Sequence, residues 1–193
     1  ISMYWKDEGY LLSKNNFDEN SIIIETFTLK HGKYTGIVYG GSSRKQKGKF
    51  QIGNKLLLNW KSKAENKSGY FNIELIKPVS PYFFDDKKRS VCILSATSIL
   101  KILLPERQVN NKIYNFFENM LADLRSDNWI KIYINWELSL IKELGFEANL
   151  KTNYNDDIKT ALTFNRNLLM ENFIIPNRLK FPLFRNILEN YFL

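Results

Sequence analysis

Basic side chains that could hold a polyanion are concentrated in one short part of the chain. Residues 30–67 carry a net charge of +9, whereas the whole chain carries +8. A positive field concentrated in so short a segment is the electrostatic signature of a surface that binds phosphates or another polyanion. The basic residues of this window are Lys30, Lys33, Arg44, Lys45, Lys47, Lys49, Lys55, Lys61, Lys63 and Lys67, and its single acid is Glu65.

Aromatic residues are interleaved with these cations and favour nucleic acid as the ligand. Bases stack on aromatic rings while phosphates pair with lysine and arginine. A solvated basic face without a ligand is the alternative interpretation, and a basic groove does not by itself distinguish DNA from RNA. The aromatic residues are Tyr34, Tyr39, Phe50, Trp60, Tyr70 and Phe71.

Residues for catalysis or metal binding are scarce. The one histidine, His31, precedes Gly32 in a predicted tight turn and is interpreted as structural, and the one cysteine, Cys92, lies in an apolar stretch and is predicted to be core. We therefore expect no catalytic residue, no disulfide, no metal site and no cofactor. The glycines at 41 and 48 are separated by six residues and Phe50 follows Lys49, so this is not a phosphate loop. A nuclease with dispersed carboxylates stays open as a different class.

Alternating patterns in the first 80 residues predict the strands that position these cations. Five short antiparallel strands at this spacing, separated by turn residues, are typical of a small barrel of the OB type. The expected strands are residues 8–13, 21–29, 33–39, 55–63 and 70–77.

The fourth predicted strand shows how core and interface share one element. Side chains of a strand point alternately to its two faces. Leu56, Leu58 and Trp60 therefore share the core face, and Lys55, Asn59, Lys61 and Lys63 share the opposite face.

Beyond Pro78 and Pro81 the pattern becomes helical, which makes the fold class α+β, an OB-type barrel followed by a helical domain. Helices are expected over residues 93–104, 113–124 and 129–144, the last being central and ending at Gly145. We expect residues 150–179 to be irregular, with a short hairpin around 160–170. A terminal helix over 181–193 should bury Phe184, Ile187, Leu188 and Phe192. The predicted domains are residues 1–80, 81–150 and 151–193.

The composition argues against a membrane protein. The longest strongly apolar run without charge lies between Arg89 and Lys101 and is too short to cross a bilayer. The N-terminal residues do not resemble a signal peptide. With a single cysteine, a reducing compartment is expected, and we predict a cytoplasmic, nucleoid-associated protein.

Several short segments, in this order and spacing over residues 3–150, resemble the RecO family of bacterial DNA-repair and recombination mediators, particularly its alphaproteobacterial form. The segments are Trp5-Lys6-Asp7-Glu8-Gly9, Leu11-Leu12-Ser13, Phe27-Thr28, His31-Gly32-Lys33, Gly40-Gly41-Ser42, Gln51-Ile52-Gly53-Asn54, Trp60-Lys61, Gly69-Tyr70-Phe71, Glu74-Leu75, Leu103-Leu104-Pro105-Glu106-Arg107, Trp136-Glu137-Leu138 and Glu143-Leu144-Gly145-Phe146.

The resemblance implies a recombination mediator without nucleotide hydrolysis. Members bind single- and double-stranded DNA, anneal complementary strands, work with RecR and engage the acidic, Phe-ended C-terminal tail of single-stranded-DNA-binding protein. Some members carry a cysteine zinc site in a small inserted region. Residues 150–179 contain no cysteine, so the sequence predicts a degenerate, zinc-free insert here.

Two sets of candidate contact residues follow. In the first, the barrel holds the DNA backbone and Tyr39 stacks on a base, whereas Trp60 belongs to the core. In the second, an adaptor function, cations beside aromatic rings of the helical part accept an acidic-aromatic peptide. The DNA-binding set is Lys33, Tyr39, Arg44, Lys45, Lys47, Lys49, Lys61 and Lys63. The peptide-binding set is Arg107, Lys112, Phe116, Lys131 and Tyr133.

Overall fold

The structure, a computed structural model, describes residues 3–64, 67–146 and 157–193. The chain divides into two compact units, residues 1–111 and 112–193, and each is described by itself. The predicted domain boundaries at residues 80 and 150 stay predictions.

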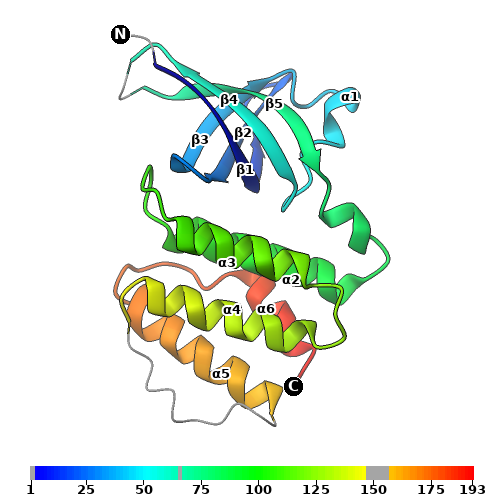
Figure 1. Cartoon of the computed structure of the whole chain (residues 1–193), viewed down its shortest axis with the longest axis vertical. Helices are drawn as coiled ribbons and strands as arrows, with labels where there is room; N and C mark the ends of the chain where they lie inside the picture. The colour runs from blue at the N-terminus through cyan, green and yellow to red at the C-terminus, as the bar shows by residue number, and fades with distance from the viewer. Residues whose placement is uncertain (1–2, 65–66, 147–156) are drawn as a thin grey trace. The chain divides into compact units, whose positions relative to one another are not determined.

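The first unit is built on a closed five-stranded barrel with the strand order β1-β2-β3-β5-β4 (Figure 1). Strand β4 pairs with β1 and so completes the circle. The five predicted strands are confirmed, with two corrections. β1 is long, and β3 and β5 pair in parallel through Gly36–Gly69 and Ile37–Tyr70. The strands are β1 Met3–Asn16, β2 Ser21–Thr28, β3 Gly32–Tyr39, β4 Lys55–Ser62 and β5 Gly69–Lys77.

The barrel interior is filled by the side chains that the alternation assigned to it. Leu56, Leu58 and Trp60 of β4 are fully buried, whereas Lys61 is exposed. Phe71 and Leu11, from β5 and β1, are in the same core. Removing these large side chains from water supplies most of the stabilisation of so small a barrel.

A short 3-10 turn, η1 (Ser80–Phe83), leads from the barrel into α2 (Lys87–Leu103). Asp86 caps this helix, accepting hydrogen bonds from the Arg89 backbone N–H at 3.1 Å and the Arg89 guanidinium at 2.6 Å. Burial alone would raise the pKa of Asp86, but the hydrogen bonds and charge of Arg89 outweigh it and lower the pKa. The helix ends before Pro105, as predicted.

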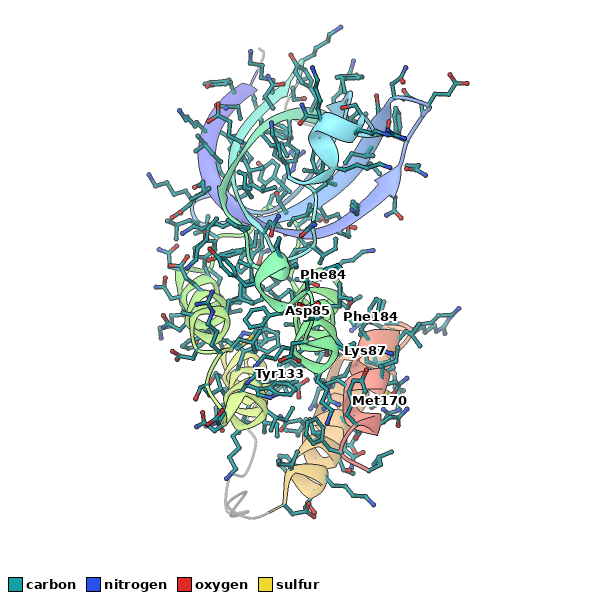
Figure 2. The ribbon with its side chains drawn as sticks, turned by 90° about the vertical axis from the view of Figure 1, so that its right-hand side faces the viewer. Phe84, Asp85, Lys87, Tyr133, Met170 and Phe184 are labelled. Carbon is teal, nitrogen blue, oxygen red and sulfur yellow. The ribbon has the colours of Figure 1, made fainter. Side chains whose placement is uncertain are left out.

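The second unit is helical, and α4 (Trp129–Glu143) is its central element as expected. Nine side chains of α4 are buried, among them Tyr133, which Figure 2 labels within this unit. Gly145, with φ of 96°, follows the end of α4 as predicted. The elements are α3 Asn111–Ala122, α4 Trp129–Glu143, α5 Ile158–Leu169, the π-helical turn η2 Met170–Ile174 and α6 Leu183–Asn190.

The hairpin predicted around residues 160–170 is wrong, because this segment forms α5. Asp157 caps the helix by accepting a hydrogen bond from the Lys159 N–H at 3.1 Å. The buried face of α5 includes Asn165, a polar residue that interrupts the apolar pattern on which a helix prediction depends. Residues 150–156 of the predicted irregular segment lie outside the described residues. Within the described parts of the chain, no helix is long and apolar enough to cross a membrane.

Candidate nucleic-acid interface

A one-turn helix, α1 (Arg44–Lys47), is labelled beside the barrel strands in Figure 1, and three of its four residues are basic. The turn before it is tight: Gly40 has φ of 73°, and a Cβ on Gly41 would lie 2.6 Å from Ile22 Cγ1. Phe50, after the helix, is buried in the core. Because both ends of this segment are fixed to the barrel and nothing in α1 is buried, its cations face solvent. The predicted residues Arg44, Lys45 and Lys47 are exposed, and Lys49 is half-buried.

A second group of residues, which we call the tyrosine–lysine row, lies on the outer face of the barrel and joins the predicted Lys61 and Tyr39 to Tyr4 and Tyr70. Tyr4 pairs with Lys61 across β1 and β4, and Lys61 pairs with Tyr70 across β4 and β5. The Lys61 Nζ lies 5.5 Å from the Tyr4 ring centroid, and the Tyr39 and Tyr70 rings are 6.0 Å apart. Tyr4 and Tyr39 are 59% and 65% exposed. Rings beside ammonium groups are what stacked bases and phosphates require.

Tyr4 was not among the predicted DNA-binding residues, although the alternation of side chains along β1 indicates that it lies on the outer face. Its neighbour Trp5 is a core residue, so alternation along β1 places Tyr4 on the outer face. Tyr4 also donates a hydrogen bond from its hydroxyl to Asn59 Oδ1 at 3.0 Å, which fixes the ring beside β4. Lys63, which follows β4, is exposed.

Lys33 lies in the interior of the unit, and its inclusion in the predicted DNA-binding set is corrected. Its side chain is only 8% exposed, and its Nζ donates a hydrogen bond to the Lys101 carbonyl at 2.6 Å. Glu106 Oε1 lies 3.7 Å from the same Nζ. An ammonium group satisfies the last carbonyls of a helix well, so Lys33 holds the end of α2 on β3 rather than facing a strand of DNA.

His31 has the structural position that its turn predicted. Its Nδ1 lies 2.8 Å from Asp7 Oδ2, and its ring stacks on Trp5 with centroids 4.1 Å apart. The buried Asp7 carboxylate also accepts hydrogen bonds from the backbone N–H groups of Lys30 and Glu8. The turn between β2 and β3 is thereby attached to β1.

Comparison with known families decides what this barrel belongs to. Residues 3–79 match the family profile described as Recombination protein O N terminal, and residues 85–156 match Recombination protein O C terminal. The chain belongs to the RecO family.

Curated relatives agree with the profiles, including alphaproteobacterial ones. DNA repair protein RecO of Wolbachia sp. subsp. Drosophila simulans (strain wRi) is 33% identical over 164 residues, which cover 84% of this chain and 68% of the relative. DNA repair protein RecO of Roseobacter denitrificans is 33% identical, with 81% and 67% covered. DNA repair protein RecO of Cereibacter sphaeroides (strain ATCC 17029) is 34% identical, with 77% and 62% covered. The predicted resemblance is confirmed, and it supports a role in DNA repair and recombination.

Members of the second predicted set, for peptide binding, differ in how far they are exposed. Tyr133 is fully buried and donates its hydroxyl to Glu137 Oε2 at 2.6 Å. Arg107 belongs to the barrel unit, where its guanidinium lies 4.6 Å from the Tyr34 ring centroid. Lys112 and Lys131 are exposed and Phe116 is half-buried.

Metal ligands do not gather in this RecO-family chain as far as the structure describes it. No group of three or more histidine, cysteine, aspartate or glutamate side chains is arranged to hold a metal ion in residues 3–64, 67–146 and 157–193. Cys92 is buried in α2, which confirms its prediction as a core residue.

Proposed function

We propose that this chain is a non-enzymatic recombination mediator whose barrel binds the sugar-phosphate backbone of single- and double-stranded DNA. The observation that carries the proposal is the exposed cationic turn α1, flanked by Lys49 and fixed at both ends to the barrel. Cations held in one place release condensed counterions from DNA when it binds, and this supplies a large share of the affinity. Neutralising phosphates on two strands also lowers their mutual repulsion, so we propose that the protein anneals complementary strands.

The tyrosine–lysine row supports an additional mode for single strands. Base stacking on an exposed ring contributes about 1–3 kcal/mol per base, and it is open only to unpaired bases. Lys61 lies between Tyr4 and Tyr70 in this row, and Lys63 follows in the chain. We therefore propose Tyr39, Tyr4 and Tyr70 as stacking residues, with Lys61 and Lys63 contacting phosphates.

The test is the salt dependence of binding to labelled single-stranded DNA, followed by fluorescence anisotropy. If about five phosphates are neutralised, the log of the association constant should fall with the log of salt concentration with a slope of roughly −3.5. Replacing Arg44, Lys45, Lys47 and Lys49 together by alanine should make the slope less steep by up to about 2.8, because each of the four lost contacts removes about 0.7.

The control variant removes the same net charge elsewhere: Lys87, Lys142, Lys159 and Lys180, all exposed, are replaced together by alanine. Its slope should stay near that of the unmodified protein. A slope that the α1 variant leaves unchanged would remove α1 from the interface. RNA of the same sequence serves as a second ligand, and equal affinity for RNA would favour the general RNA-binding alternative.

The proposal also includes protein partners. We propose RecR and the acidic C-terminal tail of single-stranded-DNA-binding protein as protein partners, and association with the nucleoid. The support is family membership together with the exposed cations Lys112 and Lys131 on the helical unit. A fluorescent tail peptide ending in Asp-Ile-Pro-Phe should bind saturably, and the same peptide ending in alanine should not. Equal binding of the two peptides would show that no apolar pocket receives the terminal ring.

A further inference from the structure

A pocket of about 300 Å³ opens in the barrel unit beside α1. Its wall combines the end of β1 (Lys14, Asn15 and Asn16) with Ser42 from the turn before α1 and Lys47 from α1 itself. The volume is at the lower limit of small-molecule sites, which suits one nucleotide and excludes a base pair within its duplex.

The lining of the pocket has the chemistry of a nucleotide site. Ile22 and Phe50, both buried core residues, supply an apolar surface for the face of a ring. Asparagine amides offer both donors and acceptors, as the edge of a base requires. Lys14 and Lys47 supply positive charge, and no carboxylate is among the described residues that line the pocket, so an anionic ligand is favoured over a cation.

Hydrogen bonds hold the walls of the pocket in place before any ligand arrives. Asn16 pairs with Ile22 across β1 and β2, and the Phe17 N–H donates to the Ser21 carbonyl at 3.0 Å. The Ser42 hydroxyl donates to the Glu19 carbonyl at 3.0 Å, which ties the turn before α1 to the β1–β2 hairpin. A preformed site loses less conformational entropy on binding.

We propose that this pocket receives one unpaired nucleobase of a bound strand, with the adjoining phosphate on Lys47 and Lys14. The inference rests on the proposed function, because Lys47 belongs both to the α1 cations that would hold the DNA strand and to the lining of the pocket. It goes beyond that function by giving the barrel a discrete site for a single base. Only an unpaired base enters such a site, so the pocket favours single strands over duplex.

The first experiment titrates the full chain, labelled with ¹⁵N, with three probes: deoxyadenosine monophosphate, deoxyadenosine and inorganic phosphate. Deoxyadenosine monophosphate and deoxyadenosine should both shift the amide signals of Gly41, Ser42 and Asn16, and inorganic phosphate should shift them less. Lys47→Ala should raise the dissociation constant of the monophosphate about fivefold, as expected for one lost charge-assisted contact, and leave that of deoxyadenosine unchanged. Lys87→Ala is the control, because Lys87 is exposed on α2 of the same unit and does not line the pocket.

A second experiment compares oligonucleotides. The double variant Asn15→Ala, Asn16→Ala should weaken binding of single-stranded DNA several-fold and leave duplex binding unchanged. Asn72→Ala, an exposed asparagine on β5 outside the pocket, should change neither. Equal loss for single strands and duplex would overturn the base-binding role.

The two proposals fail in different ways. If inorganic phosphate reproduces the shifts of the monophosphate, the pocket binds phosphate alone and the inference is overturned, while the salt slope of DNA binding still supports the proposed function. If nucleotides bind in the pocket but DNA shows no salt-dependent binding, the pocket is a site for free nucleotides, and both the inference about a bound strand and the proposed function are overturned.

Discussion

Arg185→Ala should lower the free energy of unfolding by about 3–5 kcal/mol, the cost of leaving one member of a buried ion pair without its partner. Arg185 is fully buried on α6, and Glu137 is fully buried on α4. The Arg185 Nε donates to Glu137 Oε2 at 2.6 Å, and its Nη2 donates to Glu137 Oε1 at 3.1 Å. Urea unfolding of the variant and the unmodified protein measures the difference.

The neighbours of this pair make the loss large. Tyr133 and Asn165 both donate to the Glu137 carboxylate, and Arg185 Nη2 also donates to the Leu162 carbonyl. Burial alone would lower the pKa of Arg185, but the Glu137 carboxylate, with Tyr133 and Glu189, outweighs it and holds the pKa above its ordinary value. Without the guanidinium, a carboxylate would remain in the interior with two neutral donors, and α6 would lose its hydrogen bonds to Glu137 of α4 and to the Leu162 carbonyl of α5.

Two variants separate the ion pair from ordinary surface effects. Arg178→Ala, at an exposed arginine of the same unit, should change the free energy of unfolding by no more than about 0.5 kcal/mol. The double variant Glu137→Gln, Arg185→Met should lose less than the sum of its two single variants, because neither uncompensated charge remains buried and the new amide oxygen still accepts from Tyr133. If Arg185→Ala were as mild as Arg178→Ala, the pair would carry no net stability.

The sequence does not reveal this pair, for a physical reason. The apolar face predicted for the terminal helix contains Leu188, which is fully buried, but also Phe184 and Ile187, which are half-buried. Arg185 is read as a surface residue because charged side chains are almost never fully buried unless paired. Its partner Glu137 is 48 residues away along the chain, so local pattern carries no trace of it.

The sequence predicts the strands and core of the barrel more completely than it predicts the residues of the candidate interface. Alternation along each strand depends only on which face is buried, and it correctly placed Trp60 inside and Lys61 outside. Charge alone, by contrast, could not separate Lys33, whose aliphatic stem and ammonium group are buried against α2, from the exposed lysines of α1. The parallel β3–β5 pair depends on how the sheet closes in space. That closure involves glycines whose role is visible only when their neighbours are known.

Gly69→Ala should lower the free energy of unfolding by about 3 kcal/mol, the upper end of the usual cost of overpacking a core. Gly69 pairs with Gly36 where β5 meets β3. A Cβ on Gly69 would lie 2.3 Å from Trp60 Cε2, and one on Gly36 would lie 2.6 Å from Phe71 Cδ2. Both rings are buried, so they have no room to withdraw. Equilibrium unfolding in urea measures the loss.

Gly48→Ala is the matched control, because Gly48 is exposed, has φ of −65° and would place its Cβ more than 4 Å from other groups. It should be neutral or raise stability by about 0.4–1 kcal/mol, by reducing the entropy of the unfolded chain. Gly69→Ala should also weaken binding of single-stranded DNA, because the β3–β5 contact sets the 6.0 Å spacing of the Tyr39 and Tyr70 rings. A Gly69→Ala protein as stable as Gly48→Ala would mean that Trp60 yields to the added methyl group. In that case the close contact between the Gly69 backbone and the Trp60 ring would not be required for the pairing of β3 and β5.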